Sequence, residues 1–126
     1  MQPNSLAARL IVVAAGLIGA GGIMAAAGAA HGGGGNLQPI AMVCLAHGPA
    51  LLALGLAARG RLFALAGLLL VLGTAVFSAD LLSRQANGSA LVPMLAPVGG
   101  LLMIAGWITI IVAALLSSAG ESAKIR

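Results

Sequence analysis

Four long runs of uncharged, mostly apolar residues constrain this chain more than any other feature. They cover residues 10–30, 37–58, 62–79 and 91–116. Each run is close to or above the roughly 20 residues that an α-helix needs to cross the hydrocarbon core of a bilayer. A segment in lipid must satisfy its backbone hydrogen bonds internally, so runs of this kind predict helices. We therefore expect an all-α membrane protein, a four-transmembrane-helix antiparallel bundle.

Composition supports a membrane protein, because 61% of the 126 residues are apolar and only 6% are charged. A soluble fold has no way to bury so much apolar surface. We expect a single membrane domain over residues 1–126, with helices near 6–30, 37–58, 62–84 and 97–117. The first apolar run is longer than the roughly 7 to 15 residues of a secretory signal, so we interpret it as a membrane helix.

The positive charges predict how the chain is threaded. Five of the six Lys and Arg residues fall on one side of a four-helix bundle: Arg9, Arg59, Arg61, Lys124 and Arg126. Lys and Arg favour the cytoplasmic side, so we expect a bacterial inner-membrane protein with both termini and the 59–61 turn in the cytoplasm. The loops at 31–36 and 85–92 then lie outside. The net charge of +4 therefore indicates topology, and we expect no nucleic acid partner.

Proline and glycine set the expected helix ends. The 59–61 turn is too short to cross a bundle, so the second and third helices are expected to be antiparallel neighbours. The glycine tract at 32–35 has no preferred φ and gives slack between the first two helices. Pro93 and Pro97 disfavour helical dihedral angles in the residues before them. We therefore expect the last helix to begin near Pro97, after an irregular segment at 91–96.

Small residues are the expected contacts between helices, because aliphatic side chains gain little by moving from lipid into protein. Two adjacent ridges with four-residue spacing follow the first helix: Gly21, Ala25 and Ala29, and Gly22, Ala26 and Ala30. They fit packing inside the bundle or an interface between copies of the chain, and spacing does not separate the two. Further candidate contact residues are Gly99 and Gly100, near the start of the last helix, and Cys44.

Trp107 is placed near the middle of the bilayer, about 15 Å along the helix from Pro97 at 1.5 Å per residue. An indole N–H at that depth needs an acceptor. We expect a carbonyl or hydroxyl group of the bundle, and a cofactor or a partner protein is the alternative.

Ionisable side chains at membrane depth are candidates for function, because burying them is costly. His47, midway along the second helix near Pro49, is either a neutral imidazole bonded to a backbone carbonyl or a ligand, proton or metal site. Asp80 and Arg84, one turn apart near the outer end of the third helix, are expected to pair or to line a solvent-filled outer cavity. His31, at the outer end of the first helix, either joins them or is a solvated loop-end residue.

A cofactor or metal site is not expected. The soft candidate ligands are Cys44, His47, His31, Met24 and Met42. His31 and His47 differ in depth by about 13 Å, which does not suit two ligands of one haem. No nucleophile and base occur at helical spacing, so we expect no enzyme. An anion site at the outer helix N-termini beside Arg84 is a weaker alternative.

Five short segments occur together along the chain: Gly28-Ala29-Ala30-His31-Gly32, His47 with Ala50-Leu51-Leu52, Phe77-Ser78, Pro97-Val98-Gly99-Gly100 and Gly106-Trp107. Jointly they resemble the YgdD-like family of small four-helix inner-membrane proteins, whose function is unknown. The resemblance implies four helices with cytoplasmic termini and places His31, His47 and Trp107 in the family pattern. It implies no activity. The chain departs from the pattern at Asp80, Leu82 and in its glycine tract.

Two functions fit these observations. The first is a structural or accessory subunit of a membrane complex, whose partners are the lipid bilayer, other membrane subunits or copies of itself. The small size, the lack of a nucleotide motif and the small-residue faces favour it. The alternative is a small conduit or carrier for protons, a metal ion or a small solute, through an outer-facing polar cavity lined by His31, His47 and Asp80.

Overall fold

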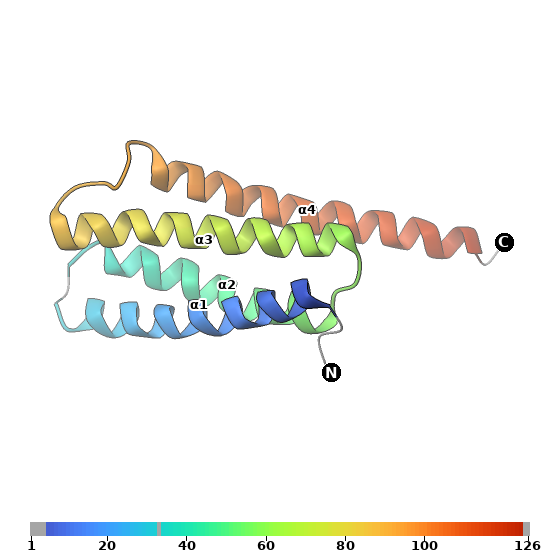
Figure 1. Ribbon diagram of the computed structural model, residues 1–126, viewed down its shortest axis with the longest axis horizontal. Coiled ribbons are helices and arrows are strands. Elements are labelled where there is room, and N and C mark those ends of the chain that lie inside the picture. The colour runs from blue at the N-terminus through green and yellow to red at the C-terminus, as the bar shows by residue number, and fades with distance from the viewer. Residues whose placement is uncertain (1–4, 33, 125–126) are drawn as a thin grey trace.

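Four helices form nearly all of the computed structural model, which describes residues 5–32 and 34–124. They are α1 (Leu6–Ala30), α2 (Leu37–Ala57), α3 (Arg61–Asn87) and α4 (Leu95–Lys124). All four are long and apolar enough to cross a membrane, and the described residues contain no strand. Successive helices run in opposite directions, so the start of α1 and the end of α4 lie at the same end of the bundle (Figure 1). The expected all-α, four-helix antiparallel bundle is confirmed.

The observed helix ends differ from the expected ones mainly around α4. α1 has the expected bounds, and α2 and α3 differ by one to three residues at their ends. The last helix was expected to begin near Pro97, and α4 begins two residues earlier, at Leu95. Pro97 then lies in the first turn, where a backbone N–H has no carbonyl partner inside the helix and its loss costs little. Leu91 to Met94 remain irregular, as expected.

α4 is also longer than expected at its other end. It has 30 residues and continues to Lys124, whereas its membrane-spanning part ends at Ser117. Its last turns extend beyond the other three helices (Figure 1). Gly33 of the glycine tract and Arg126 of the positive tail lie outside the described residues.

The helices associate as two tight antiparallel pairs. α1 packs mainly on α2, and α3 mainly on α4. In the first pair, a Cβ added at Gly48 would lie 3.2 Å from the Cα of Gly19. In the second pair, a Cβ added at Gly99 would lie 2.6 Å from the backbone N of Phe77. Close backbone approach at small residues therefore joins each pair, as expected for helices that are surrounded by lipid.

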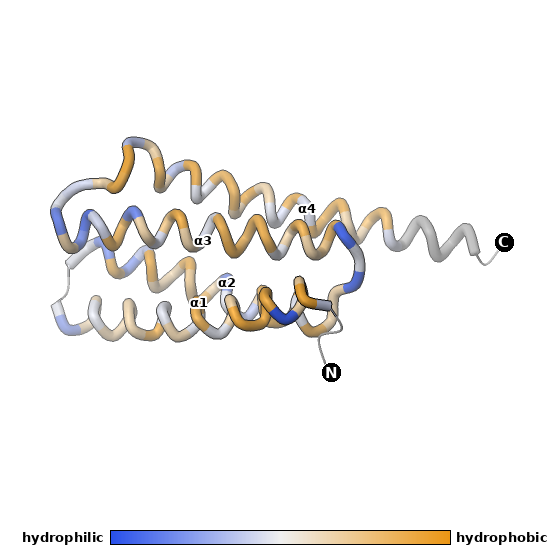
Figure 2. Tube along the Cα trace, in the orientation of Figure 1, coloured by the Kyte–Doolittle hydropathy of each residue, from blue (hydrophilic) through white to orange (hydrophobic). Residues whose placement is uncertain are grey.

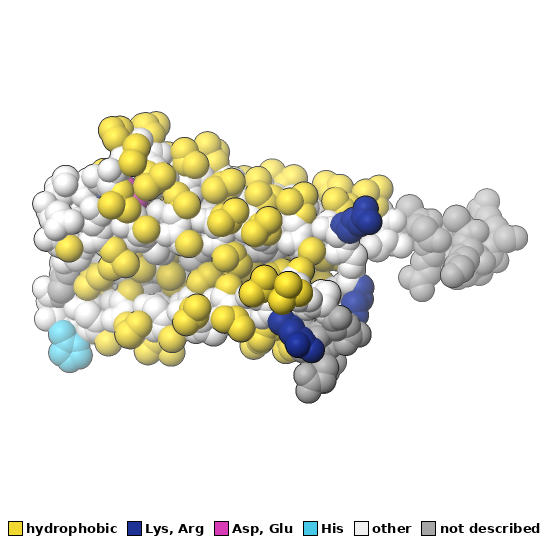
Figure 3. Space-filling model, in the orientation of Figure 1, with side chains coloured by type: hydrophobic (Ala, Val, Ile, Leu, Met, Phe, Trp, Pro, Cys, Tyr) yellow, Lys and Arg dark blue, Asp and Glu magenta, His cyan; other side chains and the backbone are white. Residues whose placement is uncertain are grey.

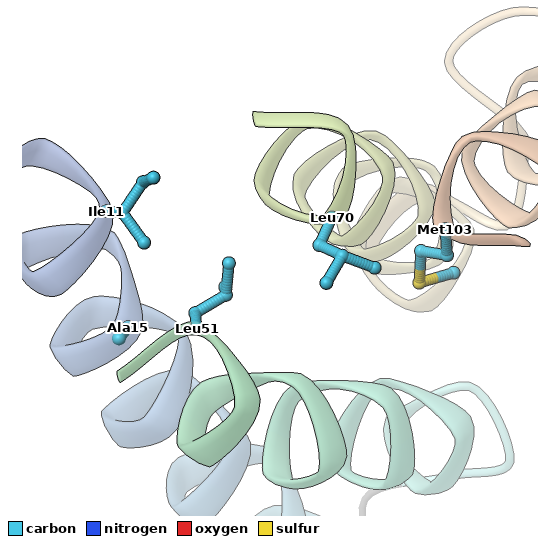
Figure 4. Packing of buried hydrophobic residues seen from close by; sticks show 5 residues of the cluster. All are labelled: Ile11, Ala15, Leu51, Leu70 and Met103. Atoms are coloured by element: carbon cyan, nitrogen blue, oxygen red, sulfur yellow. The ribbon is translucent and has the colours of Figure 1, made fainter. Parts of the chain in front are cut away.

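The two pairs meet at a central apolar core that contains residues from all four helices. Its buried members are Ile11, Ala15, Leu51, Leu70 and Met103 (Figure 4). Leu51 and Leu70 are fully buried. Contact between the pairs otherwise depends on α2 against α3 and, more sparsely, α1 against α3. The interface between the pairs is therefore the less closely packed one.

The residues of the four helices are apolar along most of their length (Figure 2), and hydrophobic side chains cover most of the face of the bundle in Figure 3. Large hydrophobic side chains such as Leu17 and Leu101 are 71% and 65% exposed. Basic side chains gather at the end that carries the turn between α2 and α3 (Figure 3). Arg9, Arg59 and Arg61 belong to that end, because α1 and α3 both begin there. An apolar belt with charge confined to the ends is the surface that a bilayer requires.

Candidate functional site

His47 and Trp107 connect the two helix pairs: His47 is buried, whereas Trp107 is 44% exposed at the surface of the bundle. The indole Nε1–H of Trp107 on α4 donates to Nε2 of His47 on α2, at 3.2 Å. Nδ1 of the same imidazole lies 2.7 Å from the carbonyl oxygen of Val43, one turn earlier in α2. The ring centroids of His47 and Trp107 are 6.0 Å apart and the rings are tilted by 55°. This side-chain hydrogen bond joins α2 directly to α4.

These two hydrogen bonds indicate the tautomer of His47. An indole N–H can only donate, so Nε2 must carry a lone pair and Nδ1 must carry the proton that Val43 accepts. His47 is thus a neutral imidazole bonded to a backbone carbonyl, which is the first of the two alternatives expected. The expected type of acceptor for the Trp107 indole N–H is wrong, because the acceptor is an imidazole nitrogen and not a carbonyl or hydroxyl oxygen. Both ring nitrogens of His47 are engaged.

Asp80 holds the loop between α3 and α4. Its side chain is fully buried, and Oδ2 accepts a hydrogen bond of 2.9 Å from Nε of Arg84, which is 40% exposed. Oδ1 accepts a second bond of 2.9 Å from the backbone N–H of Leu91, and the N–H of Val92 is a further donor. The expected pair with Arg84 is therefore present. Through its bond to Leu91, the carboxylate also holds the α3–α4 loop in place. In this loop Met94 has a φ of 66°, which is uncommon for a residue other than glycine.

His31 does not join Asp80 and Arg84. Its side chain is exposed at the end of α1, and its Nδ1 lies 2.7 Å from the carbonyl oxygen of Ala27 in the same helix. It is the solvated loop-end residue of the two alternatives. The four candidate polar residues therefore lie in three separate places. His47 is buried and bonds to Trp107, Asp80 and Arg84 form an ion pair beside the α3–α4 loop, and His31 is exposed at the end of α1.

Small polar side chains form a third group, on the facing sides of α2 and α3. Sγ of Cys44 lies 3.5 Å from Oγ of Ser78. Thr74, one turn from Ser78, is 1% exposed, and its hydroxyl oxygen has no hydrogen-bond partner. Leaving a buried hydroxyl unsatisfied costs about 1 to 3 kcal/mol. Cys44, expected as a contact residue, is indeed buried between helices.

Gly99 and Gly100 have different surroundings despite being neighbours. A Cβ at Gly99 would meet backbone atoms of α3 at under 3 Å, whereas a Cβ at Gly100 would meet nothing within 4 Å. Only Gly99 is a helix contact. On α1, a Cβ at Gly22 would lie 2.9 Å from that of Cys44, so this ridge packs inside the chain. Gly21 of the adjacent ridge has open space.

Metal-ligating side chains are scattered among the described residues. No group of three or more His, Cys, Asp and Glu side chains lies close enough there to hold a metal ion. The sequence did not single out Thr74 or Leu91, and it pointed to Ser78 only as part of the Phe77-Ser78 segment. A threonine or serine in an apolar helix gives no signal of which side faces a neighbour, and Leu91 acts through its backbone.

The fold and its apolar exterior define a small multi-pass membrane protein with four membrane-spanning helices. The chain belongs to the family described as "Protein of unknown function (DUF423)", whose family model matches residues 25–100, more than half of the chain. The matched region extends from late α1 to the start of α4 and contains His47, Asp80 and Arg84. No curated protein and no solved structure matches the chain.

Proposed function

We propose that this protein is a non-catalytic structural or accessory subunit of a complex in the bacterial inner membrane. In this proposal both termini lie in the cytoplasm, and within its family the chain belongs with the YgdD-like proteins. Its partners are the bilayer and other membrane subunits or copies of itself.

The observation that carries this proposal is that the ionisable side chains inside the bundle are hydrogen-bonded to other side chains and to backbone groups of the same chain. His47 uses both ring nitrogens within the chain, and Asp80 uses both carboxylate oxygens. A group that carries protons or ions must exchange its partners during transport. Side chains with saturated hydrogen bonds instead fix helix positions, which is what a structural subunit requires.

The outward side of α1 gives further support. Val13 and Ile23 are 59% and 65% exposed there, and Gly16 between them has no atom within 4 Å of an added Cβ. Membrane helices associate where small residues allow close backbone approach. α1 thus has room at Gly16 for a helix from another chain, in addition to the side that it uses on α2.

The test is the size of the solubilised protein at its natural level of expression. A tagged chromosomal copy, extracted in a mild detergent, is expected to migrate in a complex larger than a monomer. Gly16→Ile is expected to shift it to the monomer position without unfolding it, because the added side chain projects away from the bundle. Ile108→Leu on α4, a lipid-facing substitution on another helix, is the matched control and should leave the complex intact. The proposal is contradicted if the wild-type protein runs as a monomer and chemical cross-linking attaches no neighbouring protein to it.

The alternative is a conduit or carrier for protons, a metal ion or a small solute. A cleft of about 410 Å³ in the half of the bundle that carries the α1–α2 and α3–α4 loops, with Cys44, Thr74 and Ser78 in its wall, favours it. The rest of its lining is aliphatic or glycine, which suits a path for ions poorly. Liposomes that contain the wild-type protein and liposomes that contain His47→Ala would show different proton or metal fluxes if this alternative holds, and equal fluxes contradict it.

A further inference from the structure

The cleft of about 410 Å³ lies between α1, α2 and α3 and opens on the side of the bundle. Leu17 and Met24, which line it, are 71% and 70% exposed and therefore form its rim toward the surrounding lipid. Ile40 and Ala25 are buried at its base. Its volume falls within the roughly 300 to 1,000 Å³ of pockets that hold small molecules. A molecule dissolved in the bilayer could reach it sideways, without passing through water.

Thr74 in the wall of this cleft has a hydroxyl group that the protein leaves unused. A threonine or serine inside a helix commonly donates to the carbonyl oxygen one turn earlier. Two residues of α4 do so: Thr109 bonds the oxygen of Ala105 at 2.7 Å, and Ser117 bonds that of Ala113 at 2.8 Å. Thr74 makes no such bond although it is 99% buried. Its hydroxyl is thus a hydrogen-bond donor without an acceptor, beside an apolar cleft.

We propose that this cleft binds an uncharged lipophilic carbonyl compound from the bilayer, with its carbonyl oxygen on the hydroxyl of Thr74. The ligand must be lipophilic because most of the lining is aliphatic, with Leu37 and Leu82 among it. It must be uncharged because no Lys, Arg, Asp or Glu lines the cleft. A carbonyl oxygen is the acceptor that an unpartnered O–H requires. A quinone ring and an acyl ester both supply such a group.

Cys44 and Ser78, in the same wall, extend the polar part of the site. Their Sγ and Oγ atoms are 3.5 Å apart, so each has only one weak partner and the pair can accommodate a second polar atom of the ligand. Cys44 is also the only cysteine of the chain. Its alkylation therefore reports directly on whether the cleft is occupied. Binding in this cleft does not depend on the accessory role, and it stands even if the test of that role gives a negative result.

The experiment uses the purified full chain in dodecyl maltoside, a detergent without a carbonyl oxygen. The probes are ubiquinone-1, whose fully substituted ring cannot alkylate a thiol, and glyceryl monooleate, an ester. 1-Octadecene, which has no oxygen, is the control compound. A carbonyl probe is expected to raise the melting temperature of the protein until the site is saturated. It is also expected to slow alkylation of Cys44 by N-ethylmaleimide at least about threefold. 1-Octadecene should have neither effect. Whichever probe acts identifies the source of the carbonyl group.

Two pairs of variants locate the binding. Thr74→Val keeps the shape and removes the hydroxyl, so the probe should bind roughly three- to tenfold more weakly, the ratio that one hydrogen bond gives. Thr109→Val, the same change where the hydroxyl is satisfied, should bind like wild type. Gly21 lines the cleft and an added Cβ there would meet no atom within 4 Å, so Gly21→Leu places a side chain in the cleft and should abolish protection, whereas Gly16→Leu on the same helix should not.

The proposal is overturned if neither probe raises the melting temperature. It is equally overturned if Thr74→Val binds as tightly as wild type, or if the stabilisation persists in Gly21→Leu, since binding then occurs elsewhere. The melting temperature decides the outcome even where Cys44, only 5% exposed, reacts too slowly to be followed.

Discussion

The imidazole of His47 accepts a hydrogen bond of 3.2 Å from the indole N–H of Trp107, across the interface between the two tightly packed helix pairs. The residues are 60 positions apart in the chain and come from α2 and α4. The backbones of α2 and α4 are not in close contact, so this side-chain bond links the two helices directly. The bond therefore adds a direct link between α2 and α4 to the α2–α3 and α1–α3 contacts that join the two halves of the bundle.

The first prediction concerns this bond. Trp107→Phe retains the apolar ring and removes the donor, so the free energy of unfolding should fall by about 0.5 to 2 kcal/mol, the range for hydrogen bonds between membrane helices. His47→Ala should cost more, because it also removes packing. A double-mutant cycle, measured by unfolding in mixed micelles, should give a coupling energy of about 1 kcal/mol. Strictly additive losses would show that the contact contributes nothing.

Asp80 provides the second prediction. Asp80→Ala leaves the N–H of Leu91 without its acceptor and should lower the free energy of unfolding by about 1 to 3 kcal/mol. Arg84→Gln should cost less, about 1 kcal/mol or below, because the guanidinium is 40% exposed and partly solvated. Limited proteolysis of the 88–94 loop should become faster in Asp80→Ala than in Arg84→Gln. The reverse order would mean that the ion pair, and not the loop contact, is the main role of Asp80.

The third prediction compares two adjacent glycines. Gly99→Ala places a Cβ against the backbone of α3 and should destabilise the bundle by about 1 to 3 kcal/mol, the usual cost of overpacking. Gly100→Ala places the same atom in open space and should be neutral or slightly stabilising, because alanine favours helix. Melting temperatures in detergent measure both. Equal values for the two variants would contradict the close α3–α4 contact.

The fourth prediction tests the orientation in the membrane. In a Cys44→Ala background, Gly35→Cys should react with a membrane-impermeant maleimide on intact spheroplasts, since the α1–α2 loop is expected outside. Arg59→Cys should react only after the membrane is permeabilised. Both cysteines lie on exposed positions, so both should react fully in detergent. The opposite labelling pattern would place the termini outside the cytoplasm.

Positions along the membrane normal were predictable for most residues. The apolar runs predicted the number of helices. The rise of 1.5 Å per residue predicted similar depths for Trp107 and His47, and the hydrogen bond between the two residues agrees with those depths. The pair of Asp80 and Arg84 was also predictable, because residues four apart on a helix are neighbours. These inferences needed only distances along one helix.

Positions around each helix were not predictable. His31 and Asp80 belong to the same end of the bundle, yet His31 bonds its own helix, and the second acceptor atom of Asp80 binds the backbone of Leu91. Thr74 lines a cleft while Thr109, in a similar apolar helix, bonds its own backbone. Gly99 and Gly100 are the same residue type in adjacent places with different surroundings. Each of these outcomes depends on which side of a helix faces its neighbour.

The sequence by itself determined four helices, their approximate ends and an apolar exterior, because crossing a bilayer depends on the length and hydrophobicity of each run. Only the tertiary structure decided which polar side chains meet: His47 with Trp107, Cys44 with Ser78, and Thr74 with no partner. The physical reason is that these helices are apolar on all sides, so the contrast between apolar and polar faces that orients helices in soluble proteins is nearly absent. Close backbone contact at a few glycines and a few hydrogen bonds determine the rotation of each helix, and they exist only once the helices are packed.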